Sequence, residues 1–333
     1  MAPSSSTSHR PVPVLPCLAV ECSTCSSSRR CTVKFFSAVE KKPVGGGATG
    51  LSSELLGVKA VVCATPLGWI LVRESAGGST YMLDPRQDKK IQLPPLAGIE
   101  DDVLVYSNCL LSDQPTSPAG CIVLVVEPLE TVIWHHHMGT SVWIRHEYDI
   151  GIQGDEHHPD KIHIVPIATC HGKFYFNSCC FNEISVLEFC PGPQFSSIKL
   201  DGAGLRDSSG KGGIHVFLLE SDGELCMVRL QTVLPPASSL QVHVYRMDFS
   251  QQRWCLVNDL GDRAFFVAPF YFGASCLAGE YGIQKNCVYS VRYWRDRAFT
   301  ISNMEDGSSH VHSLHEAESI CRTSWMLPTD PKG

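Results

Sequence analysis

Short stretches of alternating hydrophobic and polar residues follow one another along almost the whole chain. The pattern is clearest in residues 213–267, which hold two pairs of such stretches. Ser221-Asp222-Gly223 joins the first pair and Ser250-Gln251-Gln252 joins the second, and Gly223 can adopt the positive φ of a tight hairpin. Because alternation with a period of two is typical of a half-buried β-strand, we predict one up-and-down sheet here.

The same pattern recurs in five further units separated by glycine, proline and acidic turn residues. These units span residues 14–38, 68–95, 109–149, 163–200 and 286–314, and residues 319–328 could add a closing strand. No segment repeats apolar residues at the helical period over ten or more positions, although residues 50–60 and 314–322 could each hold a short helical turn. Units of three or four strands recurring at roughly 40–55 residues are the signature of a β-propeller.

We therefore predict an all-β fold, a β-propeller with six blades, with five or seven blades as alternatives. A strand from one terminus should complete a blade begun at the other, because this closes the ring and hides its edges. The 333 residues then divide into a tail at 1–11, one propeller domain at 12–328 and a tail at 329–333.

Several sequence motifs occur in an order that resembles a known family. They include GWILV, YMLDPRQDKKIQLPPL, GKFYF, VFLLESDGELCMVRL, VYRMDFSQQRWCLVNDLGDRAFFV and MEDGSSHVHSL. Over residues 12–328 the chain resembles the plant F-box-associated β-propeller family, also called domain of unknown function 295. The resemblance implies that the motif residues hold the frame; these are Gly68, Trp69, Gly223, Asp248, Trp254, Leu260, Gly261, Asp262 and Arg263.

The resemblance also suggests a function. Members of the family often carry an F-box that binds the Skp-type adaptor of a cullin-RING ubiquitin ligase, while the propeller holds the substrate. An F-box needs ~40 residues of helix with apolar spacing, and residues 1–50 offer serine, proline, glycine and short strand-like runs instead.

We expect a non-enzymatic protein-interaction module with an unknown protein partner on one propeller face, a family link to ubiquitin signalling, and no Skp-type adaptor. The alternatives are a metal- or acid-dependent propeller enzyme with a site in the central channel, and a degenerate paralogue without a partner.

Charge and composition narrow the classes of partner and compartment. A formal net charge of −7 argues against non-specific nucleic-acid binding, which needs a basic face. We expect no membrane partner, because no run of ~18 apolar residues is present.

The 16 cysteines are scattered, often at strand positions, and predict reduced thiols in the cytoplasm or nucleus. Residues 1–38 are rich in serine and arginine and hold one acid, so organelle targeting through residues 1–30 is an alternative. We expect a monomer.

No catalytic residue or cofactor site is predicted. His135 and His137 would share one face of a strand, and Cys22-x-x-Cys25 is the best cysteine cluster, but a zinc site needs three or four ligands. Cys170 and His171 are adjacent, yet a Cys/His pair acts through its spatial arrangement, which adjacency alone does not show. The glycine-rich segment 202–213 lacks the Gly-Lys-Ser/Thr ending of a phosphate-binding loop.

Overall fold

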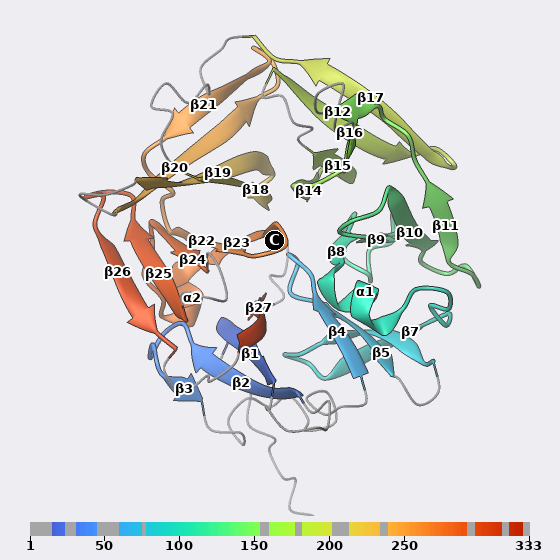
Figure 1. Cartoon of the computed structure of the whole chain (residues 1–333), viewed down its shortest axis with the longest axis horizontal. Coiled ribbons are helices and arrows are strands. Elements are labelled where there is room, and N and C mark those ends of the chain that lie inside the picture. Colours follow the sequence, from blue (N-terminus) through green and yellow to red (C-terminus); the bar gives the residue numbers. More distant parts are fainter. Residues whose placement is uncertain are drawn as a thin grey trace, which may run out of the picture.

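Six sheets surround a central axis as the blades of a propeller (Figure 1). The computed structural model describes residues 15–23, 31–44, 60–74, 78–153, 160–176, 182–201, 213–233, 239–291, 297–314 and 320–328. The predicted all-β fold with six blades is therefore confirmed.

Blade 1 joins the two ends of the chain. Its strand order is β27-β1-β2-β3, and β1 pairs with β27 from Cys17 opposite Met326 to Cys22 opposite Ile320. Figure 1 shows the dark red β27 beside the blue β1 near the axis. The strands are β27 (Ile320–Met326), β1 (Cys17–Ser23), β2 (Cys31–Ser37) and β3 (Pro43–Val44). The predicted closing strand at 319–328 is thus present and completes the ring.

Blades 2 to 5 each have four strands in the order of the sequence. Blade 2 contains β4 (Ala60–Ala64), β5 (Ile70–Glu74), β6 (Thr80–Asp84) and β7 (Lys89–Leu93), and helix α1 (Asp101–Tyr106) leads to the next blade. Blade 3 contains β8 (Asn108–Leu111), β9 (Ile122–Val126), β10 (Val132–His137) and β11 (Ile144–Glu147). The small hairpin of β12 (Ile152–Gln153) and β13 (Asp160–Lys161) follows.

Blade 4 contains β14 (Ile167–Cys170), β15 (Lys173–Phe176), β16 (Glu183–Phe189) and β17 (Pro193–Lys199). Blade 5 contains β18 (Ile214–Ser221), β19 (Glu224–Val233), β20 (Ser239–Asp248) and β21 (Arg253–Val257). The stretch 213–267 predicts these four strands, and its last residues belong to β22 (Arg263–Ala268) of the next blade.

Blade 6 has a fifth strand. It contains β22 (Arg263–Ala268), β23 (Phe272–Leu277), β24 (Cys287–Ser290), β25 (Ala298–Asn303) and β26 (Ser309–Ser313), with helix α2 (Ala278–Tyr281) between β23 and β24. Their order in the sheet is β23-β22-β24-β25-β26, and β23 is the innermost.

The hydrophobic core lies between neighbouring blades. Successive residues of one strand enter different clusters: Leu71 packs in the cluster between blades 2 and 3, whereas Ile70 and Val72 pack against blade 1. This two-sided burial explains why the inner strands are almost wholly apolar. Cysteines such as Cys17 and Cys226 act as small core residues, and burial raises the pKa of each of these two thiols to about 12.

The structure differs from the sequence prediction in short elements. Residue 60 begins β4 and residues 320–322 belong to β27, while residues 50–59 and 315–319 of the two predicted helical turns lie outside the described residues. Helices α1 and α2 have six and four residues, too few to produce a helical apolar period. Among the described residues, no helix is long and apolar enough to cross a membrane.

Candidate functional site

An inserted strand places the blade 6 hairpin in the central channel. Strand β22 runs antiparallel to β23 but parallel to β24. Without β22, the four strands β23, β24, β25 and β26 would alternate in direction like an ordinary blade. Strand β22 therefore separates the innermost strand from the rest of its sheet, and β23 is displaced inward by about one strand spacing of ~4.8 Å. In Figure 1 the hairpin of β22 and β23 reaches the centre of the ring.

The displaced β23 packs directly against β18 of blade 5. A Cβ atom on Gly273 would lie 2.4 Å from the carbonyl oxygen of Leu218, so only glycine fits this approach. The Oγ atom of Ser275 donates a hydrogen bond to the carbonyl oxygen of Glu220 at 3.0 Å, and it accepts one from Nη2 of Arg263 at 3.0 Å. The hairpin is thus fixed to a neighbouring blade along its length.

The turn of this hairpin presents two aromatic residues at the axis. Residues 269–271 join β22 to β23, and Phe270 and Tyr271 have φ angles of 62° and 61°. The left-handed region costs roughly 1–2 kcal/mol for a residue with a Cβ atom, and aromatic residues are uncommon there. The ring of Phe270 packs on Tyr106 of α1 at a centroid distance of 5.0 Å, and Tyr271 and Tyr106 are 42% and 36% exposed. We call the side of the propeller that carries this turn and Tyr106 the hairpin face.

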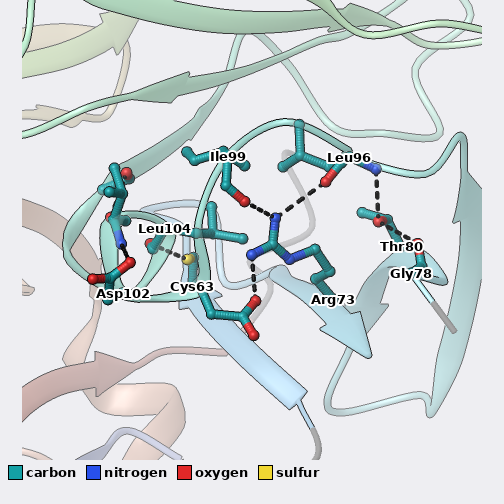
Figure 2. Close-up of polar contacts among 11 residues, drawn as sticks. Cys63, Arg73, Gly78, Thr80, Leu96, Ile99, Asp102 and Leu104 are labelled. Atoms are coloured by element: carbon teal, nitrogen blue, oxygen red, sulfur yellow. Dashed lines mark hydrogen bonds and ion pairs between the residues drawn. The ribbon is translucent and has the colours of Figure 1, made fainter. Parts of the chain in front are cut away.

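A buried arginine holds the segment that supports Tyr106. Arg73 on β5 donates from Nη1 to the carbonyl oxygens of Leu96 at 3.1 Å and Ile99 at 2.7 Å, and its Nη2 forms an ion pair with Asp101 (Figure 2). Residues 96–101 lead into α1, so the guanidinium fixes the start of this helix to blade 2. Because α1 carries Tyr106, the aromatic group at the axis rests on a rigid support.

A larger cavity lies at the opposite end of β23. Its volume is about 470 Å³, and turns of five blades contribute to its wall. The polar lining residues are Ser112, Gln114, Thr169, His171, Glu220, Asp222, Arg263, Ser275 and Glu280. Gly273 and Pro66 line both this cavity and a smaller recess at the hairpin face, so β23 lies between the two ends of the channel.

The adjacent Cys170 and His171 do come into contact at this larger cavity. The Sγ atom of Cys170 lies 3.7 Å from Nδ1 of His171 and donates a hydrogen bond to the carbonyl oxygen of Gly223 at 3.4 Å. Only 1% of Cys170 is exposed. The hydrogen bond from the Cys170 thiol connects blade 4 to the turn of blade 5. Because a reactive cysteine needs an accessible thiolate, this buried thiol that donates its proton is not arranged as a nucleophile.

The weak metal-ligand candidates of the sequence do not form a metal site among the described residues. His135 and the neighbouring His136 are buried within blade 3. Cys22 is buried in blade 1, and Cys25 lies outside the described residues. Within the described ranges, no group of three or more His, Cys, Asp or Glu side chains could hold a metal ion.

His135 is instead an aromatic core residue. Its ring packs on Phe189 at 4.7 Å and on His137 at 5.6 Å, and neither ring nitrogen has a hydrogen-bond partner among the described residues. Burial, together with the smaller effects of nearby His137, His146 and His136, lowers the pKa of His135 to about 4. The folded protein therefore keeps this imidazole neutral well below neutral pH.

This pKa predicts a specific loss of stability in acid. The unfolded chain binds a proton at His135 near pH 6.5 while the folded chain does not until about pH 4, so stability falls as pH decreases through this window. Between pH 7 and pH 5 the loss should be about 2 kcal/mol. In urea titrations at both pH values, His135→Phe should show a loss smaller by this amount, whereas His310→Phe at an exposed position should match the wild type. An equal acid loss in both variants would contradict the prediction.

The residues of the family motifs lie mainly in turns and between blades. Gly68 has a φ of 83°, Trp69 donates from Nε1 to Gln114 Oε1 at 2.8 Å, and Gly223 has a φ of 76°. Trp254 packs in the core between blades 4 and 5.

The other motif residues lie in the turn between β20 and β21 and in the connection from β21 to β22. Asp248 accepts hydrogen bonds from the hydroxyl of Ser250 and from the backbone N–H groups of Gln251 and Ser250, which lower the pKa of its carboxyl group. Leu260 donates its backbone N–H to Asn286, Gly261 has a φ of 62°, and Asp262 pairs with Lys285. Arg263 is the first residue of β22, and it donates a hydrogen bond to Ser275 on β23 of the same hairpin.

Comparisons with known proteins agree with the fold. The model of the KIB1-4 β-propeller family matches residues 49–316. No curated protein matches the sequence significantly.

Similar solved structures are distant. A candidate 6-phosphogluconolactonase from Bacteroides fragilis is 11% identical with a TM-score of 0.37, and the match covers 97% of this chain and 99% of that one. A dihydro-heme d1 dehydrogenase is 13% identical with a TM-score of 0.33, covering 98% and 77%. The Aleuria aurantia lectin is 12% identical with a TM-score of 0.30, covering 97% and 99%. These likenesses carry no argument about activity.

Proposed function

The chain belongs to the KIB1-4 β-propeller family, and from this premise we propose that it is a non-enzymatic protein-interaction module that binds a protein partner on the hairpin face. The observation that supports this proposal is the strained aromatic turn at the axis. Backbone strain persists where the surrounding structure enforces it, and it concentrates at functional sites. Tyrosine is also among the residues that dominate the binding energy of protein interfaces.

The architecture supports the same surface. Tyr271 and Tyr106 expose their rings, while β18 fixes the hairpin and Arg73 fixes α1. Side chains that are ordered before binding lose less conformational entropy when a partner docks, so a rigid aromatic pair favours affinity. The link to ubiquitin signalling rests on the resemblance to F-box-associated propellers.

Tyr271→Asn tests the proposal because it separates binding from stability. Asparagine tolerates a positive φ better than tyrosine does, so the variant should unfold at the same temperature as the wild type or slightly above it. Removal of an interface tyrosine should nevertheless weaken partner binding at least tenfold. The full chain and the variant are used as baits in plant extract, with quantitative mass spectrometry of the captured proteins.

Val311→Asn is the matched control, because Val311 is 68% exposed on β26, the outermost strand of blade 6. We expect at least one stoichiometric protein with the wild type and the control that is depleted with Tyr271→Asn. Equal capture by all three baits would place the interface elsewhere. Recovery of a Skp-type adaptor would extend the function to ubiquitin-ligase assembly, and no enriched protein at all would favour a degenerate paralogue.

An enzymatic function of the larger cavity is the second candidate. Glu220, Asp222 and Glu280 place three carboxyl groups in its wall, as an acid-dependent enzyme in the channel would require. Turnover lost in Glu280→Gln and kept in Tyr271→Asn would favour this alternative.

A further inference from the structure

The wall of a small recess beneath the aromatic turn includes two residues whose buried polar groups have no partner among the described residues. The volume of the recess is about 40 Å³, and its wall includes Asn108 at the start of β8, Thr323 on β27 and the turn residues 269–271. The Nδ2 atom of Asn108 and the Oγ1 atom of Thr323 are both buried, and neither has a hydrogen-bond partner among the described residues. Thr323 is only 4% exposed. Because buried polar groups without partners are costly, their presence in one recess indicates a ligand group that completes them.

The chemistry of the lining selects the kind of group. Asn108 Nδ2 can only donate a hydrogen bond, and the hydroxyl of Thr323 can donate one. The charged residue in the wall is Arg322, which donates from Nη1 to the carbonyl oxygen of Val62 at 2.9 Å and lies 3.4 Å from Glu21 Oε1. The recess therefore combines hydrogen-bond donors with a guanidinium that is paired with Glu21, and no acidic residue of the described part of the chain lines its wall.

We propose that this recess binds a single carboxylate group of the protein partner. One oxygen of the carboxylate would accept from Asn108 Nδ2 and the other from the hydroxyl of Thr323. The volume admits a group of this size, since about 10–15 Å³ of such a cavity holds one water molecule. Hydrogen bonds to an ionised acceptor are roughly twice as strong as neutral ones, so the arrangement favours a carboxylate over a neutral carbonyl.

The aromatic rings at the rim fit this role. Phe270, Tyr271 and Tyr106 all line the recess, so a partner that places its carboxylate inside would also contact these rings. This inference rests on the proposed function, because it names the group that the partner presents to the hairpin face. The carboxylate could be an aspartate or glutamate side chain or the C-terminus of the partner.

The first experiment uses acetate as the probe, with acetamide as a neutral probe of the same shape. Saturation-transfer NMR with the full chain at constant ionic strength measures both affinities. We expect acetate to bind at least tenfold more tightly than acetamide. Asn108→Asp keeps the shape but adds a negative charge, and Thr323→Val keeps the shape but removes the hydroxyl, so each should weaken acetate at least tenfold.

Ser112→Ala, at the larger cavity, is the control and should leave acetate binding unchanged. Acetate that binds no better than acetamide, or equally to wild type and Asn108→Asp, would overturn the proposal and leave water as the occupant. Circular dichroism at the assay temperature shows whether each variant is folded.

The second experiment identifies the source of the carboxylate and tests the proposed function separately. Two random peptide libraries are selected on the full chain, one with a free C-terminus and one with the random segment internal. Enrichment only of free C-termini would identify a terminal carboxylate, and enrichment of one Asp or Glu position in the internal library would identify a side chain. Selected peptides should bind Asn108→Asp and Tyr271→Asn at least tenfold more weakly.

The outcomes of the two experiments are distinct. Peptides that bind Tyr271→Asn weakly but Asn108→Asp normally would support the protein-binding function and overturn the carboxylate site. Acetate binding without any selected peptide would support the carboxylate site and count against the protein-binding function.

Discussion

Replacing Gly273 by alanine is expected to destabilise the propeller by about 3 kcal/mol, which would lower its Tm by about 4 °C. The added methyl group would lie 2.4 Å from the carbonyl oxygen of Leu218 and 3.3 Å from the Cβ atom of Leu219. The first contact is with backbone atoms of β18, which cannot rotate away as a side chain could. Relief of the overlap requires β23 to move away from β18, and this movement would break the hydrogen bond between Ser275 and Glu220.

Gly279→Ala is the matched control for this substitution. Gly279 lies in α2, and a Cβ atom there would meet no atom within 4 Å. Alanine is also favoured over glycine in a helix, so the control should be neutral or slightly stabilising. Differential scanning calorimetry measures both variants. Similar Tm values for the two variants would show that β23 is not held against β18 as closely as the geometry indicates.

The same contact shows where prediction from the sequence succeeds and where it stops. The strands of blades 2 to 5 can be recognised in the sequence because apolar side chains are buried along each strand. A turn residue such as Gly223 then follows the strand. Ring closure is also visible, since β27 repeats the apolar pattern at the end of the chain. These features depend on local sequence and on burial, which a periodic pattern records.

The hairpin of β22 and β23 is not visible in this way. Its turn contains Pro269, Phe270 and Tyr271, without the glycine or asparagine that normally identifies a tight hairpin. Gly273 and Ser275 look like weak strand residues, although their small size is what lets β23 approach β18. The place of β23 is determined by its contact with β18 of another blade, and such a contact produces no periodic pattern in the sequence of β23 itself.

The candidate site was missed for a related reason. The sequence drew attention to His135, which is a core residue, and to turn residues that organise the frame. Tyr106 and Asn108, Tyr271, and Thr323 lie in three separate parts of the sequence and meet only because blades 1, 3 and 6 surround one axis. The three acidic residues 100–102 before Val103 could have suggested the start of a helix, but they give no indication that Arg73 supports it.

Replacement of Arg73 by methionine is expected to destabilise the fold by about 3 kcal/mol and to loosen the hairpin face. The buried guanidinium satisfies the carbonyl oxygens of Leu96 and Ile99, and each buried carbonyl left without a donor costs about 1–3 kcal/mol. The ion pair with Asp101 contributes little of this effect, because the Asp101 side chain is 54% exposed and solvent screens the pair. Methionine keeps most of the side-chain volume, so the loss reports the hydrogen bonds rather than a cavity.

Two controls separate these contributions. Asp101→Asn removes the exposed charge but leaves both carbonyl contacts, and it should cost less than 1 kcal/mol. Arg145→Met removes an exposed arginine whose nearest carboxylate oxygen, on Glu147, is 3.9 Å away, and it should leave stability unchanged.

Urea unfolding measures these free energies, and hydrogen exchange measures the protection of the amides of Leu104 and Ser107, which form backbone hydrogen bonds at α1. Because α1 carries Tyr106, which packs on Phe270, faster exchange at these amides in Arg73→Met should accompany weaker partner binding at an otherwise intact hairpin. Faster exchange with unchanged binding would show that Tyr106 does not contribute to the interface, and would restrict the site to Tyr271 and the recess beneath it.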